Sequence, residues 1–164
     1  MSPQRLSPPE PIHAEHDTAA FACRHEPLRQ WLQKRALSNA LSGASRTYVV
    51  CQRRQVLGYY ALAAGSLALA TAPSRIRRNM PDPLPVIVLG RLAVHDDWNG
   101  RGIGGGLLKD AVLRSLQAAE LIGACALLCH AIDDDAKAFY LKHGLTESPL
   151  QPHTLMLPLR RQAR

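Results

Sequence analysis

Apolar and polar residues along the chain follow two different periods, which divide it into expected helices and strands. Between residues 28 and 36, apolar positions recur at helical spacing and predict an amphipathic helix that begins near Pro27. The β-branched and aromatic segment 47–52 predicts a strand. The apolar segment from 56 to about 69 predicts a second strand, and the polar residues 53–55 between the two predict a hairpin turn.

The second half of the chain alternates between strand and helix patterns. The nearly unbroken apolar run 86–94 is typical of a central strand that is buried on both faces. After it we expect a helix over 103–119, a strand over 124–131, a helix over 133–143 and a last strand over 154–159. The strands 86–94 and 124–131 flank the helix 103–119, so these two strands should be parallel and adjacent in the sheet.

The remaining segments are rich in proline or arginine. Four prolines within residues 1–15 indicate an extended segment that could form an edge strand, and residues 74–85 suit a short helical turn followed by a stiff, extended linker. Residues 160–164 form a basic tail. We find no internal repeat, and 164 residues are enough for one ordinary core. We therefore expect a single α/β domain over residues 1–164, with a mixed twisted sheet and helices on both faces.

A glycine-rich loop joins the strand 86–94 to the helix after it and carries the clearest chemistry. It reads Asn99-Gly100-Arg101-Gly102-Ile103-Gly104-Gly105-Gly106. Glycines let the backbone approach a ligand closely. The following helix contributes unpaired N–H groups and the positive end of its dipole, and Arg101 adds a full charge. The loop therefore predicts a site for a pyrophosphate.

Of three other interpretations of this loop, its residues exclude one and leave two open. A nucleoside triphosphatase loop needs Gly-Lys-Ser/Thr, which Gly105-Gly106-Leu107 does not supply. A dinucleotide fingerprint matches formally as Gly100-x-Gly102-x-x-Gly105, but residues 95–99 separate it from its strand. The loop could also be a turn without a ligand, although four glycines at a helix start would then cost about 0.5–1 kcal/mol each relative to alanine.

Leu92-Ala93-Val94 followed by Asn99-x-x-Gly102-x-Gly104 resembles the acetyl-CoA signature of the GCN5-related N-acetyltransferases (GNAT). The family's loop usually opens with Gln or Arg, where this chain has Asn99. The resemblance implies a GNAT fold in which two central parallel strands splay apart and the pantetheine arm of acetyl-CoA lies between them. It implies cofactor contacts at Leu92, Ala93, Val94, Asn99, Gly100, Arg101, Gly102, Ile103, Gly104, Gly105, Asp133, Ala136 and Phe139.

Further segments resemble one branch of that family, the toxins of toxin–antitoxin pairs that acetylate aminoacyl-tRNA. They are GASRTYVV (43–50), GYYALA (58–63), RNMP (78–81), LGRLA (89–93), HA (130–131), AxxFY (136–140) and SP (148–149). One departure is Arg24, where Cys23 is usually followed by glycine. The resemblance implies an aminoacyl-tRNA substrate, inhibition of translation, a ribbon-helix-helix antitoxin as partner and a homodimer. It also implies that Tyr140 is the general acid that protonates the departing thiolate of coenzyme A.

The charge of the chain agrees with a polyanionic partner. Lysine and arginine number 20 against 13 acidic residues, a net charge of +7. Solvated surface arginines are common, but three arginines within four residues favour phosphate contact with a tRNA acceptor stem. The candidate tRNA-binding residues are Lys34, Arg35, Arg46, Arg75, Arg77, Arg78 and Asn79.

Other features narrow the setting. The four cysteines lack a CxxC spacing and the N-terminal residues are polar, so we expect reduced thiols in a cytoplasmic protein. We expect no metal site, because Cys125 and Cys129 lack zinc spacing and suit a buried strand. No apolar run reaches the length of a membrane span. Two rival functions stay open: acetylation of a small amine or a protein N-terminus, and a binding module without catalysis.

Overall fold

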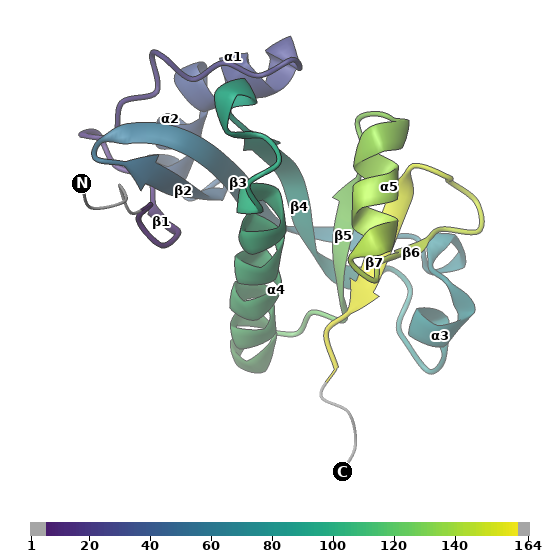
Figure 1. Ribbon diagram of the computed structural model, residues 1–164. Helices are drawn as coiled ribbons and strands as arrows, with labels where there is room; N and C mark the ends of the chain where they lie inside the picture. Colours follow the sequence, from purple (N-terminus) through teal and green to yellow (C-terminus); the bar gives the residue numbers. More distant parts are fainter. Residues whose placement is uncertain (1–5, 161–164) are drawn as a thin grey trace. The chain divides into compact units, whose positions relative to one another are not determined.

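The computed structural model describes residues 6–160 (Figure 1). It contains one mixed β-sheet, and helices occur in the connections between its strands along the chain. The strand order is β1-β2-β3-β4-β5-β7-β6. The elements are β1 (Glu10–Pro11), α1 (Glu26–Lys34), α2 (Ala36–Ser42), β2 (Arg46–Gln52), β3 (Gln55–Leu67), η1 (Leu69–Thr71), α3 (Ser74–Arg77), β4 (Leu84–Val94), η2 (Asp96–Trp98), α4 (Ile103–Leu121), β5 (Ala126–His130), α5 (Asp134–Lys142), β6 (Thr146–Glu147) and β7 (Thr154–Pro158). No described helix is long and apolar enough to cross a membrane.

The chain forms two compact units, and β3, β4 and α4 each contribute residues to both. The first unit comprises residues up to 63 together with 91–111, and the second comprises 64–90 together with the residues from 112 onward. The sequence patterns do not indicate this division, because it cuts through three continuous elements.

The first unit contains the expected hairpin. Strands β2 and β3 pair antiparallel from Arg46↔Leu62 to Gln52↔Gln55, and the short edge strand β1 pairs with β2. The helix that the apolar spacing predicts over 28–36 is present, but it is interrupted. Arg35 departs from helical geometry and separates α1 from a second helix, α2, which we did not predict. The core of this unit is Ile12, Phe21, Leu32, Ala36, Val49, Cys51, Val56, Tyr59 and Ala93.

The second unit contains the parallel pair that the sequence predicts. Strands β4 and β5 pair in parallel from Val86↔Ala126 to Leu89↔Cys129, and β7 pairs antiparallel with β5. The short strand β6, which the sequence patterns did not reveal, pairs with β7. The core of this unit is Ala72, Ile76, Leu84, Val86, Ala126, Leu128 and Met156.

Strand β4 differs from its prediction in length and burial. It begins at Leu84 and includes Pro85, which we had assigned to the preceding linker. Its second half is not buried on both faces: Gly90 is exposed, and Leu92 and Val94 are half-buried. The pairing of β4 with β5 ends at Leu89, so the residues of β4 after Leu89 are not paired with β5. The prediction of uniform burial was therefore wrong beyond Leu89.

The two ends of the chain are described only in part. The N-terminal segment extends to the edge strand β1, as its prolines suggested, but residues 1–5 lie outside the described part. Of the basic tail, Arg160 is described and residues 161–164 are not.

Candidate functional site

The glycine-rich loop begins after a short 3-10 turn, η2, and ends in the first turn of α4. Gly100 has φ 79° and Gly102 has φ 82°, in the left-handed region where a side chain is strained. A Cβ at either position would meet no atom within 4 Å, so the loop is open on that side. The backbone of both glycines is therefore accessible to a ligand that approaches the loop.

The start of α4 presents unpaired amides beside these glycines. The Gly106 N–H donates to the Gly102 carbonyl at 3.1 Å. The amides of Ile103, Gly104 and Gly105 precede this bond and have no carbonyl one turn back in the helix. Amides of this kind, together with the helix dipole, favour an anion such as a phosphate.

His95 holds the polypeptide that leads into the loop, a role that the sequence patterns did not reveal. Its side chain is buried, its Nε2 donates to the Ala20 carbonyl at 3.1 Å, and its Nδ1 accepts the Asp97 N–H at 3.1 Å. These two bonds require the neutral ring with its proton on Nε2. The His95 N–H also donates to the Leu57 carbonyl at 2.8 Å, so one residue ties the turn η2 to two other segments.

Arg101 and Asn99 are exposed at the rim of the loop. The guanidinium of Arg101 lies 4.4 Å from the centre of the Trp98 ring, within the range of a cation–π contact. Trp98 itself is half-buried in η2. The positive charge that the sequence indicated is thus present next to the loop amides.

The end of β4 alternates between the core and the surface. Ala93 is buried in the core of the first unit, whereas Leu92 and Val94 on either side of it are half-buried. The alternation follows from the period of two along a strand. Backbone contacts of Leu92 and Val94 with a cofactor stay predictions.

Tyr140 lies in the second unit, on α5. Its side chain is buried, and its ring centroid lies 5.4 Å from that of Phe139 at an interplanar angle of 63°. Burial raises the pKa of the Tyr140 phenol well above its ordinary value, and the neighbouring Cys129 raises it further. Within residues 6–160 its hydroxyl makes no hydrogen bond, so the proton is available for donation.

The start of α5 explains the position of two other candidate residues. Asp133 is the N-cap, and its carboxylate accepts the Ala136 N–H at 2.8 Å. Asp134 and Asp135 follow in the first turn, where negative charge is favourable. In this structure Asp133 and Ala136 therefore have a capping role, and their contact with a cofactor is untested.

The candidate residues fall into two groups that belong to different units. Leu92 to Val94 and the loop from Asn99 to Gly105 lie in the first unit, and Asp133 to Tyr140 lie in the second. The structure brings the members of each group together within one unit.

The predicted basic residues are also divided. Arg75, Arg77 and Arg78 are exposed on and next to α3 in the second unit. Arg160 joins them, because its Nη2 donates to the Ile76 carbonyl at 3.1 Å. We define the basic segment as these four arginines; the sequence had placed Arg160 only in a tail.

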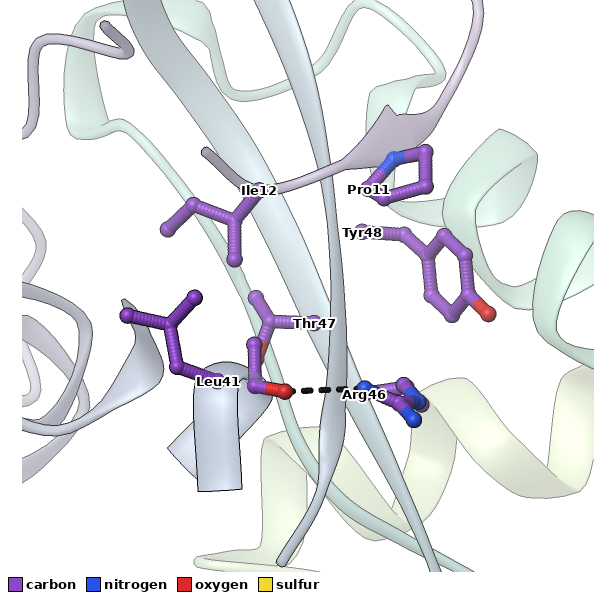
Figure 2. Close-up of a pocket in the computed structure, with 7 residues that line it drawn as sticks. Pro11, Ile12, Leu41, Arg46, Thr47 and Tyr48 are labelled. Atoms are coloured by element: carbon purple, nitrogen blue, oxygen red, sulfur yellow. Dashed lines mark hydrogen bonds between the residues drawn. The ribbon is translucent and has the colours of Figure 1, made fainter. Parts of the chain in front are cut away.

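Lys34, Arg35 and Arg46 are exposed in the first unit. Arg46 Nη1 donates to the Ala40 carbonyl at 2.8 Å, and Figure 2 marks this bond with a dashed line. Arg46, Thr47 and Tyr48 line a cavity of about 370 Å³, whose other walls are Pro11, Ile12, Ala40 and Leu41 (Figure 2). The hydrogen bond from Arg46 pairs a carbonyl in the last turn of α2, so Arg46 has a structural role at the end of this helix.

Glu10, His16 and Cys51 form the one described group of three side chains spaced closely enough for a metal ion. Among the described residues, Nε2 of His16 contacts Glu10 at 2.8 Å, and its Nδ1 accepts the His13 N–H at 3.0 Å. Both ring nitrogens thus already have partners within the protein. None of the four cysteines forms a disulfide. Cys129 is buried in β5, as expected, but Cys125 is half-buried and precedes β5, so that part of the prediction was wrong.

Comparisons with known proteins place the chain in a family. A family profile described as an acetyltransferase (GNAT) domain matches residues 43–147. A tRNA-acetylating toxin from Mycobacterium tuberculosis is 49% identical over 151 residues, which span 92% of this chain and 91% of that protein. The probable toxin TacT from Sinorhizobium fredii is 30% identical, over 88% of this chain and 86% of its own.

Solved structures agree with this placement. A mutant of KacT superposes with a TM-score of 0.88 at 25% identity, covering 95% of this chain and 96% of its own. AtaT complexed with acetyl-methionyl-tRNA superposes with a TM-score of 0.87 at 27% identity, covering 94% and 95%. The profile match and the curated relatives together show that the chain belongs to the GNAT acetyltransferase family.

Proposed function

We propose that this protein transfers an acetyl group from acetyl-CoA to the α-amine of an aminoacyl-tRNA and so blocks translation. The observation that carries the proposal is the 49% identity to a tRNA-acetylating toxin, which extends over 92% of the chain. An N-acetylated aminoacyl group has lost the amine that forms the next peptide bond. The product is therefore of no use to an elongating ribosome.

The residues that would hold acetyl-CoA are those of the glycine-rich loop and the end of β4. Gly100 and Gly102 expose their backbone, and the first amides of α4 and the charge of Arg101 favour the pyrophosphate. Leu92 and Val94 would bond the pantetheine arm through their backbone, as a further strand does in a sheet. A mutant of AtaT, a structural relative, has been solved with the C-terminus of the antitoxin AtaR and acetyl-CoA.

The reaction does not require a strong general base at the amine, but it does require a proton donor for the departing thiolate. Acetyl-CoA supplies the acetyl group as a thioester, and the attacking amine forms the amide as the carbon–sulfur bond breaks. An α-amine with a pKa of about 8 is partly deprotonated at neutral pH, so a strong general base is not required. The amine loses one proton and the sulfur gains one, so the proton count balances.

Tyr140 is our candidate for the donor to the sulfur. Burial raises the pKa of its phenol, which keeps it protonated, and its hydroxyl is not engaged elsewhere within the described residues. A phenol is a weak acid beside a thiol of pKa about 8.5, so proton transfer must be concerted with the departure of the sulfur. Phe139 would pack beside the cofactor, and Asp133 and Ala136 would support it through the helix cap.

The acceptor tRNA would lie against the basic residues. Arg75, Arg77, Arg78 and Asn79 form an exposed positive stretch, and Lys34, Arg35 and Arg46 supply charge in the first unit. Contacts of this kind recognise the phosphate backbone and the shape of an A-form stem rather than base sequence. AtaT, a structural relative, is known in complex with acetyl-methionyl-tRNA.

A protein with this activity needs an inhibitor in its own cell. We propose an antitoxin with a ribbon-helix-helix DNA-binding head and an acidic or amphipathic tail that covers the segment around Arg75 to Arg78. Structures of AtaT include one bound to the C-terminus of the antitoxin AtaR. We further propose that the protein is a homodimer that acts in the cytoplasm.

One experiment separates this proposal from its rivals. The purified protein is incubated with labelled acetyl-CoA and total charged tRNA, and the acetylated aminoacyl group is identified after digestion. We expect label on one or a few aminoacyl-tRNAs and none on uncharged tRNA. Label on polyamines or on peptide N-termini at comparable rates would favour the broader acetyltransferase, and no transfer to any amine would favour a binding module.

A further inference from the structure

Strand β3 and helix α4 fit together closely at Gly58. A Cβ on Gly58 would lie 3.0 Å from Cδ1 of Leu107 and 3.1 Å from Cγ2 of Ile103. Both distances are shorter than ordinary van der Waals contacts. The absence of a side chain at Gly58 therefore allows the first two turns of α4 to approach the strand.

A partly buried hydrogen bond joins the same two elements further along. The Tyr60 hydroxyl donates to Oδ2 of Asp110, and the Tyr60 side chain is fully buried. Gly58 and Tyr60 are two residues apart and share one face of the strand. Ile103, Leu107 and Asp110 follow at intervals of four and three and share one face of the helix.

We propose that Tyr60 and Asp110 are a positioning pair that fixes α4 so that its N-terminus meets the pyrophosphate of acetyl-CoA. This inference rests on the proposed function, because it assumes that the loop holds that cofactor. Steric fit at Gly58 controls how closely the helix approaches the strand. The directional bond at Asp110 controls where the helix lies along its own axis.

The geometry makes the bond sensitive to movement of the helix. A shift by one residue moves α4 by about 1.5 Å along its axis, which would separate the hydroxyl from the carboxylate. Because Tyr60 is fully buried, its hydroxyl could not then replace the carboxylate with water, so the shifted position is unfavourable. Because Ile103 lies seven positions before Asp110 on the same helix, the bond also fixes the position of the loop amides.

A plain structural role would predict a different result, and the neighbouring residue provides the control. Tyr59 is also fully buried, and its hydroxyl donates to the Leu28 carbonyl in α1 at 2.6 Å. Tyr59→Phe thus removes a partly buried bond donated by a tyrosine hydroxyl of the same strand, but one that goes to a backbone carbonyl and does not reach α4. Any loss that only reflects stability should appear in both variants.

The test measures acetyl-CoA affinity by calorimetry and the melting temperature for Tyr60→Phe, Asp110→Ala, Asp110→Asn and Tyr59→Phe. We expect Tyr60→Phe and Asp110→Ala to weaken acetyl-CoA binding by on the order of tenfold, which is less than the roughly 100-fold loss of reaction rate that a 1 Å misplacement can cause. Asp110→Asn should stay close to wild type, because its amide oxygen still accepts the hydroxyl. Tyr59→Phe should lower the melting temperature and leave the affinity unchanged.

A second ligand shows which part of the cofactor is affected. S-acetylpantetheine lacks the pyrophosphate, so its weak affinity should be the same in the wild type and in Tyr60→Phe. An unchanged acetyl-CoA affinity in both Tyr60→Phe and Asp110→Ala would overturn the positioning pair. If Tyr60→Phe fails to fold, the contrast between Asp110→Ala and Asp110→Asn decides. Failure of the wild type to bind acetyl-CoA would instead contradict the proposed function.

Discussion

The guanidinium of Arg101 lies over the ring of Trp98, 4.4 Å from its centre. The two residues flank Asn99 and Gly100 at the opening of the glycine-rich loop, so the contact holds a positive charge beside the loop amides. A pyrophosphate at these amides would attract Arg101, because an ionic hydrogen bond to phosphate is stronger than a cation–π contact at an exposed site.

Trp98 should therefore report the binding of acetyl-CoA. We expect a change in tryptophan fluorescence on titration with acetyl-CoA, since the charge over the Trp98 ring is drawn towards the ligand. The chain has one other tryptophan, Trp31, which lies under Arg91 in the same manner and provides the control. Trp31→Phe should keep the signal and Trp98→Phe should lose it. A signal that disappears only with Trp31→Phe would contradict this arrangement.

Gly102→Asp should abolish acetyl-CoA binding while the protein stays folded. The change places a side chain and a negative charge on a residue with φ 82°, in the space that the pyrophosphate should occupy. Gly43→Asp is the matched control, because Gly43 is exposed, has φ 83° and open space around its Cβ, and lies at the end of α2 rather than in the loop. Calorimetry should show loss of binding for the first variant only. Equal binding by both variants would remove the loop from the cofactor site.

The sequence predicted the elements that depend on local patterns. The apolar period around residues 28–36, the hairpin at 53–55 and the glycines at 100 and 102 each act through neighbouring residues. The structure contains a helix, a hairpin and a positive φ at these positions, but Arg35 interrupts the helix and Gln55 already belongs to β3. The parallel pairing of β4 with β5 also followed from the helix between them.

The features that the sequence did not reveal depend on contacts between distant residues. His95 binds the Ala20 carbonyl, Tyr60 binds Asp110 and Arg160 binds the Ile76 carbonyl, and no periodic pattern connects these positions. The loss of burial after Leu89 has the same origin, because it depends on where the partner strand ends. The role of Tyr140 was predicted from the resemblance to a family and not from the pattern of apolar and polar residues.

The basic segment should affect tRNA and not acetyl-CoA. Charge reversal at Arg77 and Arg78 to Glu should weaken the use of aminoacyl-tRNA and reduce its dependence on salt, because phosphate contacts release counterions. Arg53 and Arg54 are exposed in the hairpin turn, and their reversal to Glu makes the same change in net charge away from the basic segment. We expect this control to keep most of its activity. Parallel loss of acetyl-CoA affinity and tRNA use in the Arg77/Arg78 variant would indicate a structural role instead.

The dependence of turnover on pH should follow the acceptor rather than Tyr140. Burial raises the pKa of Tyr140, so this group stays protonated beyond its ordinary value of about 10. The single-turnover rate should increase as the acceptor amine loses its proton, near pH 8, and then stay level up to about pH 10. Rapid-quench assays with short mixing times avoid hydrolysis of the aminoacyl ester. A decrease in rate between pH 8 and 9 would show that a group with a lower pKa must be protonated.

Replacement of Tyr140 by phenylalanine tests the proposed chemistry most directly. The change keeps the ring and its contact with Phe139, 5.4 Å away, and removes only the hydroxyl. General acids typically contribute about 10²–10⁴-fold, so the single-turnover rate should fall by on the order of a hundredfold or more. Acetyl-CoA affinity should hardly change, because the charge on sulfur develops only in the transition state.

Expression of the wild type should arrest growth, and expression of Tyr140→Phe should not. Phe139→Leu is a useful comparison at saturating acetyl-CoA, since it disturbs the packing of α5 and a proposed cofactor contact but keeps the hydroxyl. It should lower stability more than Tyr140→Phe and the chemical rate less. A phenylalanine variant with a nearly normal single-turnover rate would leave Tyr140 with a packing role alone.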